Sequence, residues 1–230
     1  GGLLNATFGN VTELIIATIA LRQGLHEIVK ASIVGSIIGN LLLLLGASML
    51  AGGLKYKEQK FSQVGSSINV SMMAICLIAM VVPSILSYGA VFDPALQAPG
   101  LAPRLLHHSS VGISIVMLIV YGLSLLFSLR THQHVFSSDA HEHEQPEWPR
   151  GFATVALLVI TVVVAWTSDV FVASLDGLMQ AHPIFTPTFM GVVVVAIVGN
   201  AAEGSVAIWV ARQNKMELSF QIAMGSSIQI

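Results

Sequence analysis

Charge and cysteine are scarce in this sequence of 230 residues. Asp, Glu, Lys and Arg make up 10% of it. A soluble domain carries about 25%, so charged side chains are too few here to cover a water-soluble surface. The formal net charge of −2 excludes a basic nucleic-acid-binding domain and a highly charged disordered chain. The one cysteine, Cys76, excludes an intramolecular disulfide and a thiolate metal cluster.

Apolar residues, by contrast, are abundant. They account for 54% of the chain, and the mean hydropathy is +0.80. A membrane-spanning helix needs about 20 mostly apolar residues, whereas the alternating strands of about ten residues that build membrane β-barrels are missing. We therefore expect an all-α, polytopic bundle of transmembrane helices. The expected helices cover 3–21, 28–52, 66–90, 109–130, 151–175, 184–210 and 217–230.

Basic residues are distributed unequally between the two ends of these helices. One side has Arg22, Lys30 and Arg104. The other side has Lys55, Lys57, Lys60, Arg130, Arg150, Arg212 and Lys215. Because Lys and Arg are enriched in cytoplasmic loops, we expect the polar loop 131–150 to be cytosolic. With four histidines and four acidic residues, this loop divides the chain into two halves.

The two halves resemble each other at an offset of 190 residues. Over positions 9–40, ten residues are identical to those found 190 positions later. The identical pairs include Gly9–Gly199, Asn10–Asn200, Glu13–Glu203, Glu27–Glu217 and Ser36–Ser226. The two copies start on the first and the sixth expected helix, so they cross the membrane in opposite directions. We therefore predict two inverted repeats, 1–130 and 151–230, an architecture of secondary transporters that bind ions near the membrane midplane.

Away from the ends of the expected spans there are three carboxylates: Glu13, Asp169 and Glu203. A charged carboxylate near the bilayer centre costs at least about 2.5–3.5 kcal/mol, and no Lys or Arg in the same stretches can pair with the two glutamates. Two facing carboxylates suit a hard divalent cation such as Ca²⁺. When no cation is bound, the pair is expected to take up a proton rather than stay doubly charged. Competition of Ca²⁺ and H⁺ for the same oxygens, combined with alternating access, predicts antiport.

Small and polar residues near the two glutamates are candidate ligands. Asn10 and Asn200 precede them by three residues, on the same helix face. Gly9 and Gly199 allow each helix to open locally, so that backbone carbonyls face the ion. Five more residues complete or support the coordination: Ser36, Asn40, Ser226, Ser227 and Gln229. The alternatives are protonated glutamates that hydrogen bond between helices, and routine packing of small residues in membranes.

Several motifs resemble the cation/proton exchanger (CAX) family of the calcium/cation antiporter superfamily. They are GLLNATFGN at 2–10, GNVTELI at 9–15, GSIIGNLLLL at 35–44, RTHQHVF at 130–136, GNAAE at 199–203 and MGSSIQI at 224–230. The resemblance covers nearly the whole chain. It implies an eleven-helix fold of which this sequence is a fragment, with one helix before Gly1 and about three after Ile230. It also implies that Glu13 and Glu203 bind the cation, with Asn10 and Asn200 in the motif positions.

The resemblance also identifies Asp169 as an acidic residue on the access path, and two departures from the family. Ser168 is followed by Asp169, at a position where the family usually has Glu. Gly204 stands where the family has His after the glutamate, and Gly39 stands where it usually has Ser. The loss of the histidine bears on proton coupling and ion choice, whereas the intact glutamates support cation exchange.

The function expected from all of this is Ca²⁺/H⁺ antiport, by a transporter that is not an enzyme and has no cofactor beyond the transported Ca²⁺ and H⁺. The alternatives are a Na⁺/Ca²⁺ exchanger of the same superfamily, an intramembrane metalloenzyme and a passive cation channel. The run His141–Glu144 in the polar loop is either a solvated linker or a weak collector of cations. We expect the plasma membrane, with the vacuolar membrane as alternative; a homo-oligomer stays open.

Overall fold

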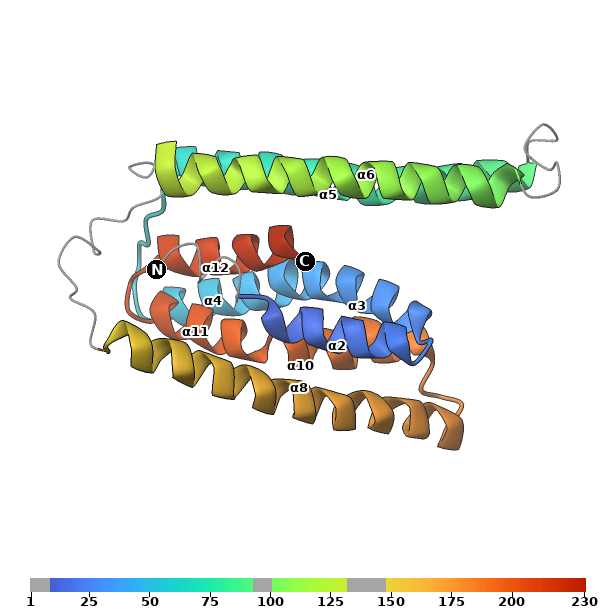
Figure 1. Cartoon of the computed structure of the whole chain (residues 1–230). Helices are drawn as coiled ribbons and strands as arrows, with labels where there is room; N and C mark the ends of the chain where they lie inside the picture. Colours follow the sequence, from blue (N-terminus) through green and yellow to red (C-terminus); the bar gives the residue numbers. More distant parts are fainter. Residues whose placement is uncertain (1–8, 93–100, 132–147) are drawn as a thin grey trace. The chain divides into compact units, whose positions relative to one another are not determined.

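The computed structural model describes residues 9–92, 101–131 and 148–230, and every regular element in these ranges is a helix (Figure 1). Four helices are long and apolar enough to span a membrane, or five with one bent pair. The prediction of an all-α membrane protein is confirmed. Most of the polar loop 131–150, with its four histidines and four acidic residues, lies outside the described residues.

The helices follow the expected spans with some corrections. The span predicted at 28–52 is continuous from His26 to Gly53, with a π-helical segment in its middle. The span predicted at 109–130 begins earlier, at Leu101, so His107 and His108 lie inside the helix. The span predicted at 184–210 is bent by 55° between Gly199 and Ala201. The elements are α2 (Val11–Arg22), α3 (His26–Ile38), η1 (Gly39–Leu44), α4 (Leu45–Gly53), α5 (Gln63–Phe92), α6 (Leu101–Leu126), η3 (Phe127–Thr131), α8 (Arg150–Ala181), α9 (Pro187–Phe189), η5 (Met190–Val195), α10 (Ala196–Gly199), α11 (Ala201–Ala211) and α12 (Met216–Gln229).

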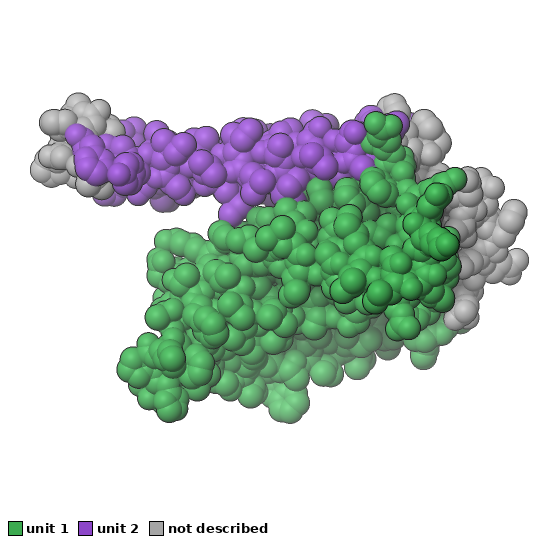
Figure 2. All heavy atoms as spheres, turned by 180° about the vertical axis from the view of Figure 1, so that it is seen from behind, with its two compact units in different colours: residues 1–63, 137–230 green, residues 64–136 purple. Residues whose placement is uncertain are grey.

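Packing divides the chain into two units, coloured separately in Figure 2. Unit 2, residues 64–136, contains α5, α6 and η3, and the apolar side chains of α6 are not buried. Unit 1 contains the remaining helices and both glutamates. Because two repeats can interdigitate, units defined by packing do not test the predicted repeat boundaries.

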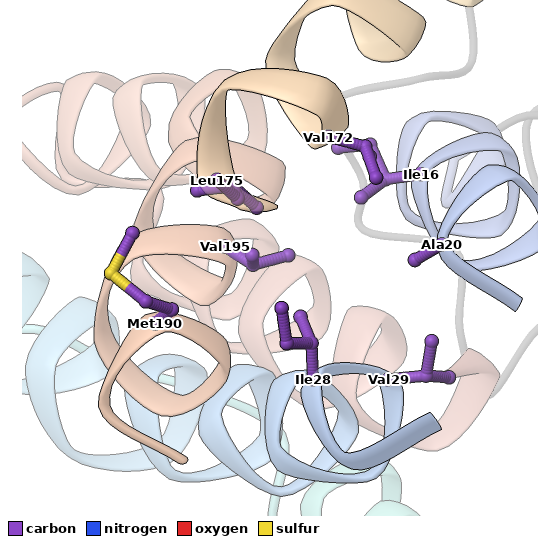
Figure 3. Packing of buried hydrophobic residues seen from close by; sticks show 8 residues of the cluster. All are labelled: Ile16, Ala20, Ile28, Val29, Val172, Leu175, Met190 and Val195. Carbon is purple, nitrogen blue, oxygen red and sulfur yellow. The ribbon is translucent and has the colours of Figure 1, made fainter. Parts of the chain in front are cut away.

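A cluster of apolar side chains joins four segments of unit 1 (Figure 3). Ile16 and Ala20 come from α2, and Ile28 and Val29 come from α3. They meet residues of α8 and η5, namely Val172, Leu175, Met190 and Val195. Between membrane helices such contacts stabilise through van der Waals packing rather than through exclusion of water. The cluster holds α2, which carries Glu13, against the bent helix that carries Glu203.

Two glycines allow α3 and η5 to approach closely. A Cβ atom on Gly35 would collide with the backbone of Val192, and one on Gly191 would lie 2.6 Å from the carbonyl oxygen of Ile28. Small residues at such crossings are typical of membrane helix packing. Ser36, the residue after Gly35, is thereby placed beside the bent helix.

The turns after α2 and after α11 have the same conformation, 190 residues apart. Gly24 has φ of +77° and Asn214 has φ of +65°. Leu25 N donates to Ala20 O at 2.9 Å, and Lys215 N donates to Val210 O at 3.1 Å. This pattern is the Schellman motif, in which a left-handed residue ends a helix. The similarity seen in the sequence thus extends to backbone geometry.

Candidate ion-binding site

Both motif asparagines lie directly before the first residue of a helix. Asn10 precedes α2 with φ of −107° and ψ of 24°, and Asn200 separates α10 from α11 with φ of −91° and ψ of 10°. Neither side chain caps its own helix, although capping is the usual role of Asn at this position. The helix break expected next to Gly199 is therefore present, and it frees the Asn200 amide for contacts elsewhere.

Each asparagine bonds to the matching serine of the opposite half of the chain. Asn200 Nδ2 donates to Ser36 Oγ at 2.8 Å. Asn10 Nδ2 donates to Ser226 O at 2.9 Å, and Ser226 Oγ lies 3.4 Å from Asn10 Oδ1. Since these residues are matched by the offset of 190, the contacts are reciprocal, as at a twofold axis.

Asn40 connects the two sets of contacts. Its Nδ2 donates to Asn200 Oδ1 and to Ser226 Oγ, both at 3.0 Å. The side chain is 1% exposed, so these bonds form away from solvent, where an unmade bond costs about 1–3 kcal/mol. Five predicted site residues therefore form one network: Asn10, Ser36, Asn40, Asn200 and Ser226.

Three of the four carboxylate oxygens of Glu13 and Glu203 are buried without a hydrogen-bond partner. Both carboxylate oxygens of Glu13 and Oε2 of Glu203 are inaccessible and accept no hydrogen bond. The ion pair found among the described residues joins Lys30 to Glu27, so neither site glutamate has a basic partner there. A buried, unpaired carboxylate is costly unless it binds a cation or a proton.

Each glutamate lies near the glycine of the opposite motif. A Cβ atom on Gly199 would lie 3.3 Å from Glu13 Cγ and 3.5 Å from Glu13 Oε1, so this glycine leaves room for the carboxylate. Gly9 and Glu203 line the same pocket. The structure thus places Glu13 beside the helix break at Gly199, and Glu203 in one pocket with Gly9.

That pocket has a volume of about 610 Å³ and lies between α11 and α12. Its polar lining combines Glu203 and Asn10 with Ser226, Gln221 and Gln229. Gln221 was not predicted from the sequence. Its spacing offered a signal, because Gln221, Gly225 and Gln229 recur every four residues and so share one face of α12.

A second pocket of about 440 Å³ lies on the opposite side of α11 and is mostly apolar. Asn40, Asn200 and Gly204 line it. A Cβ atom on Gly204 would meet Leu44 Cδ1 at 3.5 Å, an ordinary contact. Position 204 therefore belongs to this second pocket rather than to the pocket that Glu203 lines.

Two predicted residues lie apart from the network. Asp169 is exposed on α8 and lines neither pocket, whereas its neighbour Ser168 is buried. Ser227 Oγ donates to Ala223 O of its own helix at 3.0 Å. Within the described residues, no group of three or more His, Cys, Asp or Glu side chains is arranged to hold a metal. A cation here would depend on two carboxylates together with amide, hydroxyl and backbone oxygens.

Comparison with known proteins finds the same similarity along the whole chain. The family model described as "sodium/calcium exchanger protein" matches residues 1–130 and 152–230. The chain is 42% identical to the Ca²⁺/H⁺ antiporter of Aphanothece halophytica, and 43% identical to the Ca²⁺/H⁺ antiporter ChaA of Bacillus subtilis. The alignments cover 100% of this chain but 63% and 64% of those relatives. The chain therefore spans less than two thirds of their length.

A solved structure of the Ca²⁺/H⁺ antiporter protein YfkE is also similar. The TM-score is 0.76 at 38% sequence identity, over 100% of this chain and 63% of that one.

Proposed function

The chain belongs to the sodium/calcium exchanger protein family. We propose that the whole protein exchanges Ca²⁺ for H⁺ across a membrane. The observation that carries the proposal is the burial of unpartnered carboxylate oxygens on Glu13 and Glu203. The names of the relatives agree with it, since they are Ca²⁺/H⁺ antiporters.

In the proposed mechanism, Ca²⁺ and protons occupy the same oxygens in turn. Ca²⁺ takes six to eight oxygen ligands, and the carboxylates of Glu13 and Glu203 supply up to four. Amide oxygens of Asn10 and Asn200 are further donors. When Ca²⁺ leaves, protons bind to the carboxylates and neutralise them. The protonated site then becomes accessible from the other side of the membrane, where the protons are released.

We propose that 1–130 and 151–230 are inverted repeats and that their meeting point is this site. The matching Schellman turns and the reciprocal Asn–Ser bonds support this. In transporters of this architecture, rocking of the repeats exposes a central site to each side in turn.

The protein is an integral membrane protein. We propose that the end rich in Lys and Arg faces the cytosol, and that the membrane is the plasma membrane or a vacuolar membrane. One relative whose name refers to the vacuole is the vacuolar calcium ion transporter of Schizosaccharomyces pombe, which is 37% identical.

The experiment that tests the proposal is uptake of ⁴⁵Ca²⁺ by the full-length protein in proteoliposomes. A pH gradient is expected to drive uptake by the wild type and not by Glu203→Gln. The matched control is Glu58→Gln, because Glu58 is exposed on the connection between α4 and α5. Uptake that follows a Na⁺ gradient at constant pH would instead identify a Na⁺/Ca²⁺ exchanger.

A further inference from the structure

A polar connection leads from the pocket beside Glu203 to one end of α12. Gln221 lines the pocket, and its Nε2 donates to Glu217 Oε1 at 2.7 Å. Glu217 lies in the first turn of α12, at the end where the basic residues gather. A carboxylate thus marks the point where the polar wall of the pocket reaches the helix end.

The position of Glu217 is held by the connection between α4 and α5. Its Oε2 accepts a hydrogen bond from the backbone N–H of Ser62. The Phe61 ring stacks on Phe220 at a centroid distance of 5.7 Å, and Gln59 Nε2 donates to Ala211 O at 2.9 Å. These contacts fix the carboxylate in place rather than leaving it to swing in solvent.

The surroundings of Glu217 are mainly positive. Exposed cations at this end are Lys55, Lys57, Lys60, Arg212 and Lys215. Among the described residues of the same end, the acidic side chains are Glu58 and Glu217, and Glu217 is the one joined to the pocket. A divalent cation that approaches this end meets repulsion over a distance of about 8–10 Å in physiological salt. Glu217 offers it the opposite charge beside the pocket.

The matching position in the first half of the chain differs. Glu27, the counterpart of Glu217, pairs with Lys30 at 3.0 Å. The counterpart of Gln221 is Ala31, and η5 packs there, since a Cβ atom on Gly191 would lie 2.5 Å from Ala31 Cβ. In the described residues, the polar connection exists only on the α12 side.

We infer that Glu217 and Gln221 form the mouth through which a hydrated divalent cation reaches Glu203 from the Lys-rich end of the protein. The inference rests on the proposed exchange function and adds a recruiting carboxylate outside the pair that binds the ion. Glu217 attracts the cation, and the Gln221 side chain lies between Glu217 and the pocket. Both residues therefore affect Ca²⁺ binding from the Lys-rich face and not from the opposite face.

The test is ⁴⁵Ca²⁺ flux by the full-length protein in membrane vesicles of known orientation, with Ca²⁺ varied on one face at a time. Glu217→Gln keeps an oxygen for the Ser62 N–H but removes the charge. We expect the half-saturating Ca²⁺ concentration at the Lys-rich face to rise about five-fold, the order expected for one charge acting on a divalent cation in a wet site. The maximal rate, and half-saturation at the opposite face, are expected to stay within about two-fold of the wild type.

Controls separate recruitment from a structural effect. Glu58→Gln makes the same charge change on the same connection and is expected to leave both faces unchanged. Gln221→Leu is expected to act in the same direction as Glu217→Gln. A Gln229→Cys variant in a background without other cysteines is expected to react with a membrane-impermeant thiol reagent added at the Lys-rich face, and more slowly with Ca²⁺ present.

Three results would overturn the inference. The first is unchanged half-saturation of Glu217→Gln at the Lys-rich face. The second is an equal rise at both faces, which would indicate a general structural role. The third is reaction of Gln229→Cys from the opposite face only. Absence of wild-type flux under a pH gradient would instead overturn the exchange function, and this inference with it.

Discussion

Replacing Gly35 with alanine tests how the fold positions the site. The new Cβ would collide with the backbone of Val192, which cannot move as freely as the end of a side chain. Overpacking of this kind costs about 1–3 kcal/mol. Ser36 follows directly and accepts a hydrogen bond from Asn200 at 2.8 Å, so separation of α3 from η5 also stretches the network. We therefore expect weaker Ca²⁺ binding as well as lower stability.

Gly46→Ala is the matched control, because this glycine lies in the same span and has no atom within 4 Å of the new Cβ. Both variants gain the helix propensity of alanine, roughly 0.5–1 kcal/mol, so the difference between them isolates the collision. Chemical unfolding of the full-length protein in detergent measures it, and Ca²⁺ titration measures the effect on the site. Equal stability of the two variants would refute the close packing of α3 on η5.

Further predictions concern the network and its protons. Gly204→Ala is expected to keep Ca²⁺ transport within about two-fold of the wild type, since its Cβ makes an ordinary contact; a large loss in the flux assay would contradict this. Asn40→Leu is expected to weaken Ca²⁺ binding about ten-fold, because it removes the two buried hydrogen bonds that Asn40 donates to Asn200 Oδ1 and Ser226 Oγ. Ser205→Ala, at an exposed position of α11, is the control that is expected to bind Ca²⁺ like the wild type in the same titration. Acidification is expected to raise half-saturating Ca²⁺, because protons occupy the carboxylates; in Glu13→Gln the dependence on pH is expected to shrink, and a dependence identical to that of the wild type would count against competition.

The sequence predicted which polar residues come together, because the repeat carries them. Glycine, asparagine and glutamate recur at an offset of 190, and the structure brings Glu13 to Gly199 and Asn10 to Ser226. The length of the apolar stretches likewise predicted the membrane spans. Within the membrane, backbone N–H and C=O groups must bond to each other, so an apolar stretch of this length forms a helix.

Other features could not be predicted from the same pattern. Asn40 aligns with Ile230, so the repeat gave no indication that its amide connects both halves. The helix that begins at Leu101 extends beyond the apolar stretch, because hydropathy marks the hydrocarbon core and not the end of a helix. The place of Gln221 in the pocket wall depends on the packing of α12 against α11, which local sequence spacing only suggests.

The release of protons on Ca²⁺ binding tests the central claim most directly. The full-length protein in weakly buffered detergent solution is titrated with Ca²⁺ while a pH indicator records protons released. Because both carboxylate oxygens of Glu13 and one of Glu203 are buried without hydrogen-bond partners, we predict that Ca²⁺ binding releases protons in the wild type and fewer in Glu13→Gln and Glu203→Gln. Ca²⁺ binding by the wild type without proton release would contradict competition for the same oxygens.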